Sequence, residues 1–243
     1  MKKVYICGDS FGFSDPAYPG LSWTETLAKI LPLDTKIINL SKVCASNLLI
    51  NLQVNQAIAQ KANYVIFMGT SVLRDEVKFN VANNSQKQLI DRFVDITSIN
   101  NVEDHDLISY TMLNINDNFL SSSVDTLKSY SMMKDLSLLI YKDTCIIENA
   151  LQKLVDSNIP FTFDQGGFEN PKYVTPEAQY FEKFKKYFSK INLWDYSPSR
   201  KFRPYHHIVN EKDINYIAEY YCELINTELQ INTITNDNIS SLH

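Results

Sequence analysis

The chain has 243 residues, of which 44% are hydrophobic, and its 23 basic and 28 acidic side chains give a formal net charge of −5. This composition is that of an ordinary globular protein and excludes a wholly disordered chain. The acidic balance provides no overall positive field, so we expect neither nucleic acid nor a membrane as a partner. The length corresponds to one large domain or two small ones.

The N-terminus and the rare residue types narrow the class further. The run before Gly8 holds four apolar residues, too few for a signal peptide or a membrane span, which predicts a cytoplasmic protein. Four cysteines without a CxxC pair indicate neither a disulfide scaffold nor a zinc site. Only six glycines occur, and none form a GxGxxG or Walker loop. We therefore expect no metal and no cofactor.

The first 69 residues alternate short apolar runs with amphipathic segments. This alternation is typical of βαβ units, and their right-handed crossovers imply a parallel sheet. A capping box formed by Ser22 and Glu25 begins one predicted helix, which ends at about Leu31, and Ser46 caps the next. The predicted strands cover residues 3–7, 36–40 and 64–68.

The rest of the chain continues this pattern after an interruption. Residues 73–123 show looser patterning, which we interpret as an insertion over the site. Further predicted elements are a helix over 123–155, a strand at 159–163, a helix from Thr175, a fifth strand at 191–194, and a last helix from the Asn210 cap to about Leu229. The sequence thus predicts one α/β/α domain over residues 1–229, with a mostly parallel five-stranded sheet, and a polar tail over 230–243.

Small polar turns follow three of the predicted strands. They are Gly8-Asp9-Ser10, Cys44-Ala45-Ser46 and Gly69-Thr70-Ser71. Because the carboxyl ends of parallel strands meet at one edge of a sheet, these turns should converge on one crevice. A serine in such a turn can present both its hydroxyl and its backbone N–H to the same site.

The segment Gly8-Asp9-Ser10-Phe11-Gly12 resembles the GDS motif of the SGNH (GDSL-like) hydrolase superfamily. The resemblance implies a three-layer flavodoxin-like fold and a nucleophilic Ser10 that forms an acyl-enzyme with an ester, as in an esterase or O-deacetylase. Gly8 and Asp9 would then shape the turn, and Gly69 would shape the turn after the third strand.

Two further segments resemble the oxyanion-hole blocks of that superfamily. In residues 39–47, Cys44 stands where the family has glycine, and its backbone N–H would join that of Ser10. In Gly69-Thr70-Ser71, Ser71 replaces the family asparagine, so a hydroxyl of Ser71 or Thr70 would donate. Asn47 is the candidate donor if Ser71 is not.

His206 and His207 precede the last helix, as the family histidine does. We favour His207 as the general base because it is nearer to the Asn210 cap. No aspartate stands three residues before either histidine, so a backbone carbonyl or a distant carboxylate such as Asp195 would orient the imidazole. Adjacent histidines on an extended chain point apart, which argues against a metal site.

Several alternatives stay open at this stage. Arg74 and the two acidic residues after it fit an exposed helix start or an anion clamp. The main rival to a hydrolase is a degenerate binding or scaffold protein that keeps Ser10 without turnover. Acyl transfer to an acceptor hydroxyl is a third possibility. The residues define the substrate no further than a small-molecule or carbohydrate ester, and they leave the oligomeric state open.

Overall fold

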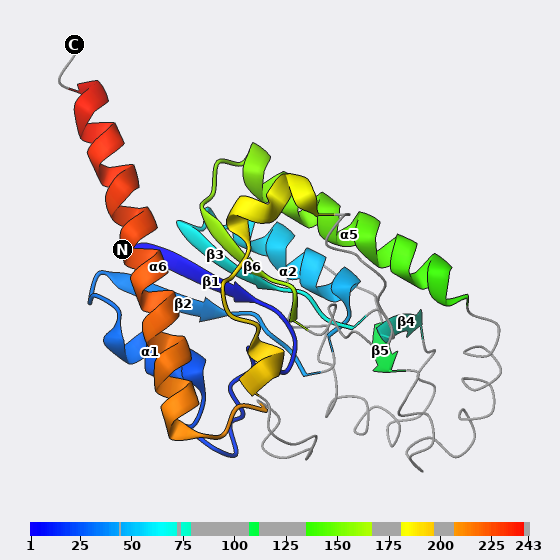
Figure 1. Cartoon of the computed structure of the whole chain (residues 1–243). Coiled ribbons are helices and arrows are strands. Elements are labelled where there is room, and N and C mark those ends of the chain that lie inside the picture. The colour runs from blue at the N-terminus through cyan, green and yellow to red at the C-terminus, as the bar shows by residue number, and fades with distance from the viewer. Residues whose placement is uncertain are drawn as a thin grey trace.

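The computed structural model describes residues 1–43, 45–71, 74–78, 107–111, 135–166, 181–196 and 207–240. Its centre is a four-stranded sheet in the order β2-β1-β3-β6, in which every neighbouring pair is parallel. Figure 1 shows the sheet edge-on between helices. The parallel α/β prediction is confirmed. The strands are β1 (Lys2–Cys7), β2 (Thr35–Asn39), β3 (Tyr64–Met68) and β6 (Phe161–Asp164).

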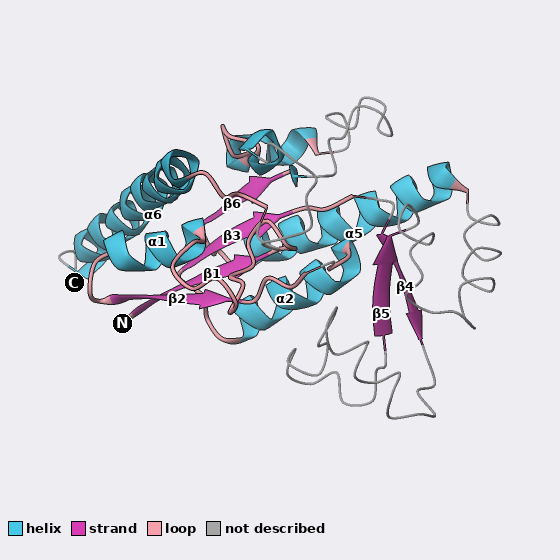
Figure 2. Cartoon of the chain, turned by 90° about the horizontal axis from the view of Figure 1, so that it is seen from below, coloured by secondary structure: helices cyan, strands magenta, loops and turns pink. Residues whose placement is uncertain are grey.

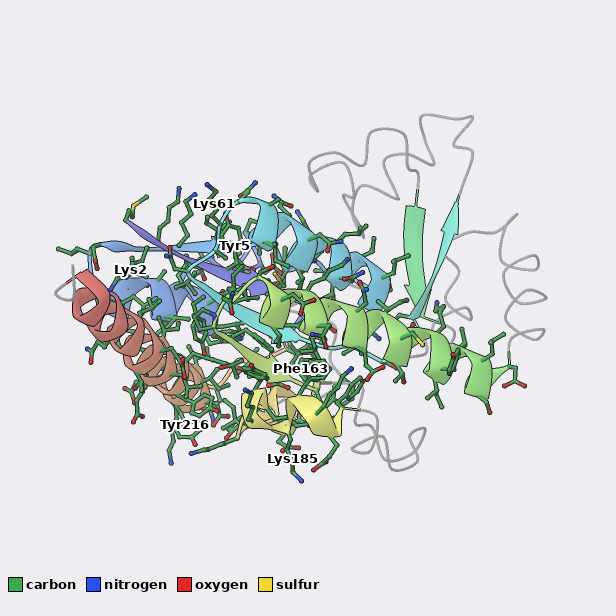
Figure 3. The ribbon with its side chains drawn as sticks, turned by 90° about the horizontal axis from the view of Figure 1, so that it is seen from above. Lys2, Tyr5, Lys61, Phe163, Lys185 and Tyr216 are labelled. Atoms are coloured by element: carbon green, nitrogen blue, oxygen red, sulfur yellow. The ribbon has the colours of Figure 1, made fainter. Side chains whose placement is uncertain are left out.

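Helices cover both faces of the sheet (Figure 2). The helices α1 (Trp23–Ile30) and α6 (Glu211–Ser240) pack on one face, and α2 (Asn47–Ala59) and α5 (Leu136–Asp156) pack on the other. Successive residues of a strand point to opposite faces. Tyr5 therefore lies in the hydrophobic cluster under α2 and α5, together with Phe163 (Figure 3), whereas Ile6 lies in the cluster under α1 and α6. Burial on both faces explains why the central strands β1 and β3 read as continuous apolar runs.

Helix caps identified in the sequence begin helices where predicted. Ser22 and Glu25 form the reciprocal capping box of α1, and the Ser46 side chain accepts a hydrogen bond from the N–H of Leu49. At the start of α6, Asn210 Oδ1 accepts from Lys212 N at 3.0 Å. Since each cap satisfies backbone donors that the helix leaves free, it fixes where the preceding turn ends.

The predicted fifth strand at residues 191–194 is wrong. In its place lies a 3₁₀ helix, η6 (Leu193–Tyr196), and the described part of this sheet edge has one isolated parallel bridge between Phe163 and Phe188. Two side chains account for the difference. Asp164 Oδ2 accepts from Leu193 N at 3.2 Å, and Asn192 Oδ1 accepts from Trp194 N at 2.9 Å. These carboxylate and amide groups bind the N–H groups that a sheet would otherwise pair.

Other boundaries also differ from the predictions, and one predicted helix lies outside the described residues. The last helix continues to Ser240 rather than ending near Leu229. The predicted helix start at Arg74 is instead the first residue of strand β4 (Arg74–Lys78), which pairs antiparallel with β5 (Leu107–Thr111). This pair belongs to the predicted insertion and lies beyond the end of the sheet to which the parallel strands point (Figures 1 and 2). The helix predicted from Thr175 lies outside the described residues.

The three described cysteines differ in their exposure. Cys7 is buried in β1, Cys222 is half-buried, and Cys145 is exposed on α5. A search of the described helices finds none with both the length and the hydropathy needed to cross a membrane.

Gly12 provides a test of packing in the turn after β1. A Cβ added there would overlap Met68 Cε and Ser41 Oγ. Because overpacking forces neighbours to shift, Gly12→Ala should lower the free energy of unfolding by about 1–3 kcal/mol, measured by urea denaturation. Gly20→Ala separates this steric cost from backbone strain. A Cβ at Gly20 meets no atom closer than Lys29 Nζ at 3.8 Å, but φ there is +80°, so any loss of stability in Gly20→Ala comes from the backbone conformation. A Gly12→Ala protein as stable as wild type would contradict this packing argument.

Candidate functional site

The turn after β1 is held from two directions. Gln53 on α2 makes two hydrogen bonds to Gly8: its Oε1 accepts from Gly8 N at 2.7 Å, and its Nε2 donates to Gly8 O at 3.2 Å. Within the turn, Asp9 Oδ1 accepts from Phe11 N at 3.0 Å. This Asx-type contact stabilises the turn locally, which is the role the sequence suggested for Asp9. Together these contacts fix the backbone that carries Ser10.

Ser10 and His207 are in hydrogen-bond contact. Ser10 Oγ lies 2.8 Å from His207 Nε2, although 197 positions separate the two residues. The imidazole ring also packs against Phe11, with ring centroids 4.8 Å apart and planes inclined by 30°. When Nδ1 carries the proton, Nε2 can accept the serine hydroxyl proton. The structure thus brings together the two residues predicted as nucleophile and base, while His206 lies outside the described residues.

The backbone of His207 is in the left-handed region, with φ of +58°. Two other non-glycine residues of the described part of the chain have a positive φ, Lys61 and Asn158, and both lie just after a helix, where this conformation commonly ends it. His207 instead precedes α6, and no described helix ends directly before it. Sparsely populated backbone conformations cluster at functional sites, where the surroundings hold them in place. The next residue, Ile208, is fully buried and anchors the segment.

Asp9 also connects the turn to the end of β3 and to β4. Its Oδ2 accepts from Thr70 Oγ1 at 2.8 Å and from Arg74 Nη1 at 2.7 Å. The same Arg74 nitrogen donates to the carbonyl of Ala45 at 2.9 Å. Arg74 is therefore not an exposed helix start, and its Nη1 binds an internal carboxylate and a carbonyl rather than an external anion.

Asn47, at the start of α2, binds both sides of the Thr70 peptide. Its Oδ1 accepts from Thr70 N at 2.9 Å, and its Nδ2 donates to Thr70 O at 3.0 Å and to Asp143 Oδ2 on α5 at 2.7 Å. The amide group of Asn47 is thus fully engaged, as are the hydroxyl and N–H donors of Thr70. Neither side chain has a donor left for an oxyanion, which corrects the sequence-based predictions of a Thr70 hydroxyl or an Asn47 amide donor.

The other predicted site residues described at this edge are Ser10, Ser71 and Gly69. Within the described residues, the backbone N–H of Ser10 donates to no protein acceptor. Ser71 is half-buried at the end of β3, next to Thr70. Gly69 extends the pairing of β3 with β6, since its N–H donates to Asp164 O at 2.8 Å. Cys44 lies outside the described residues.

The other described candidate groups take no part in the contact between Ser10 and His207. Burial raises the pKa of the Cys7 thiol well above its ordinary value, so this buried neighbour of the turn is no competing nucleophile. Asp195 is exposed on η6, and within the described chain its carboxylate makes no hydrogen bond to the imidazole. The described residues contain no group of three or more His, Cys, Asp or Glu side chains placed to hold a metal ion.

Comparisons with known proteins give no match: no family model fits the chain, and no curated protein sequence is similar to it. The geometry of the Ser10–His207 contact and its surroundings is therefore what bears on function.

Several of these contacts lie beyond the sequence predictions. Four side chains hold the strand ends in place, and the sequence pattern predicted this role for none of them. They are Asn47, Gln53, Arg74 and Asp143. The sequence held one signal for Gln53 and Asp143, because each is a polar residue on an otherwise apolar helix face. The structure shows that both side chains are buried.

Removing the Asn47 amide should destabilise the whole edge. Asn47→Ala leaves buried groups of Thr70 and Asp143 without their partner, which should lower the free energy of unfolding by about 2–4 kcal/mol in urea denaturation. Asn47→Ala combined with Asp143→Ala should cost less than the sum of the two single changes, because the buried carboxylate is removed with its partner. Strict additivity would contradict direct coupling between Asn47 and Asp143.

Proposed function

We propose that this protein is a serine hydrolase that cleaves an ester through an acyl-enzyme on Ser10. The observation that carries the proposal is the 2.8 Å contact between Ser10 Oγ and His207 Nε2. A serine hydroxyl is a weak nucleophile near neutral pH, and a neutral imidazole in hydrogen-bond contact can accept its proton.

The place of this contact in the fold supports the same proposal. The strand order β2-β1-β3-β6 corresponds to the first four strands of the flavodoxin-like order, whose ligands bind at the carboxyl ends of the strands. Ser10 follows the carboxyl end of β1, and His207 precedes the last helix. We therefore assign the chain a three-layer flavodoxin-like fold of the SGNH hydrolase type, on its architecture and on the Gly8-Asp9-Ser10 motif.

In the first half of the reaction, Ser10 Oγ attacks the ester carbonyl carbon and its proton passes to His207 Nε2. The negative oxygen of the tetrahedral intermediate accepts hydrogen bonds from the N–H of Ser10 and Cys44 and from the Ser71 hydroxyl. The bond to the alcohol oxygen then breaks, and that oxygen takes the proton from the imidazolium. The alcohol leaves, and the acyl group remains on Ser10.

In the second half, His207 takes a proton from water, and the resulting hydroxide attacks the acyl carbonyl carbon. The bond from the carbonyl to Ser10 Oγ breaks, Oγ regains its proton from the imidazolium, and the carboxylic acid leaves. One ester and one water thus give one acid and one alcohol, with Ser10 and His207 restored.

The aromatic side chains beside His207 indicate where the alcohol part of the ester lies. Since His207 must deliver a proton to the alcohol oxygen, that group sits next to the imidazole. Phe11 packs on the imidazole, and the ring of Trp194 packs on Phe11 with centroids 5.4 Å apart. Trp194 is 37% exposed, so part of its surface is accessible. An apolar or ring-shaped alcohol, from a small molecule or a carbohydrate, suits this surface.

Covalent labelling tests the proposal directly. A fluorophosphonate should react with wild type, because Ser10 Oγ bonds to phosphorus as fluoride leaves and the imidazole takes the proton. Ser10→Ala and His207→Asn should each abolish labelling and hydrolysis of a small aryl ester. Asparagine is the chosen replacement at position 207 because it tolerates a positive φ better than alanine.

His206→Ala is the matched control and should lose much less activity than His207→Asn. Labelling that persists in Ser10→Ala would end the proposal. A folded wild type that no fluorophosphonate labels would instead support the rival, a binding or scaffold protein.

The Ser71 hydroxyl should matter for the rate. Ser71→Ala should slow ester hydrolysis by about 10²-fold with little change in thermal stability, because one oxyanion donor is lost. Ser71→Thr keeps a hydroxyl and should retain most of the rate. Equal rates for wild type and Ser71→Ala would remove Ser71 from the oxyanion hole.

A further inference from the structure

A buried ion pair lies beside the proposed nucleophile. Asp9 immediately precedes Ser10, and its carboxylate lies 2.7 Å from Arg74 Nη1. The two side chains are 3% and 12% exposed, so water screens this pair far less than a surface pair. The other described partners of the carboxylate are neutral donors, the hydroxyl of Thr70 and the N–H of Phe11.

The charge of Asp9 opposes the proposed reaction unless a cation compensates it. The N–H of Ser10, which would hold the oxyanion, belongs to the peptide unit that joins Asp9 to Ser10. A negative charge that develops on that oxygen is therefore close to the carboxylate. In a buried environment, like charges a few ångströms apart repel strongly, and this repulsion raises the barrier because it grows in the transition state.

Arg74 also contacts the two other turns that line this edge. Its Nη1 donates to the carbonyl of Ala45, the residue after Cys44, and its backbone N–H donates to the carbonyl of Ser71 at 3.1 Å. One residue thus binds all three segments that carry the proposed oxyanion donors.

We infer that Arg74 is a positioning residue of the proposed hydrolase, which neutralises Asp9 beside the oxyanion and fixes the turns of Ala45 and Ser71 around it. The inference rests on the proposed function. Because Arg74 is the first residue of β4, the insertion contributes directly to the site rather than only lying over it.

The rate constant of fluorophosphonate labelling, measured on the full chain, tests this role. Arg74→Met should label about 10- to 100-fold more slowly than wild type, because the Asp9 charge loses its counter-ion. Arg74→Lys should recover most of that loss, since it keeps a positive charge. Asp9→Asn combined with Arg74→Met should label about tenfold faster than Arg74→Met alone, because both charges are then absent. A purely structural role for Arg74 predicts no such rescue.

Lys183→Met is the control for loss of a positive charge, since Lys183 pairs with Glu148 at 3.5 Å and is largely exposed. It should label like wild type. If thermal denaturation shows that Arg74→Met does not fold, Arg74→Lys and the double variant carry the test, and both should label within about tenfold of wild type.

The possible failures are distinguishable. A wild type that is not labelled removes the proposed function itself. A wild type that is labelled, with Arg74→Met equally fast or the double variant as slow as Arg74→Met, overturns the role of Arg74 alone.

Discussion

Three hydrogen-bond donors from different parts of the chain converge on the buried carboxylate of Asp9, and the arrangement of this edge of the sheet depends on them. They are the N–H of Phe11 in its own turn, the hydroxyl of Thr70 after β3, and the guanidinium of Arg74 on β4. A buried carboxylate is tolerated only when charges and hydrogen bonds compensate its lost hydration. The hydrogen bonds to Asp9 therefore hold the end of β3 and the start of β4 against the turn that carries Ser10. The contacts of Asp9 therefore position Ser10 as much as the contacts of Ser10 itself do.

A second set of polar contacts holds the same edge from the side of α2 and α5. The Asn47 side chain hydrogen-bonds to both the N–H and the carbonyl of Thr70, and it also donates to the carboxylate of Asp143. Thr70 thus joins the Asn47 and Asp9 groups into one buried network. Such a network is stable when every member is paired, and it becomes costly when one partner is lost. It gives the proposed site a rigid support on one side, while Phe11 supports the imidazole on the other.

Local patterns in the sequence predicted the features that depend on local physics. Apolar runs located β1 and β3, and the caps at Ser22, Ser46 and Asn210 located three helix starts. The predictions failed where distant partners decide the outcome. Residues 191–194 are apolar enough for a strand, but side-chain acceptors from Asp164 and Asn192 bind their N–H groups. Thr70 resembled a free donor because its partners, Asp9 and Asn47, are far away in sequence. For the same reason, nothing in the pattern around Arg74 indicated its pairing with Asp9.

The paired hydrogen bonds between Gln53 and Gly8 have a consequence for dynamics. The N–H of Gly8 donates to Gln53 of α2 rather than to a neighbouring strand, whereas its carbonyl accepts from both Gln53 and the backbone N–H of Lys42. Gln53 is fully buried, so water reaches this amide only when α2 separates from the sheet. Deuterium uptake at Gly8 therefore reports the opening of a helix rather than the fraying of β1. The backbone next to the proposed nucleophile shares the protection of the core, even though it lies at the end of its strand.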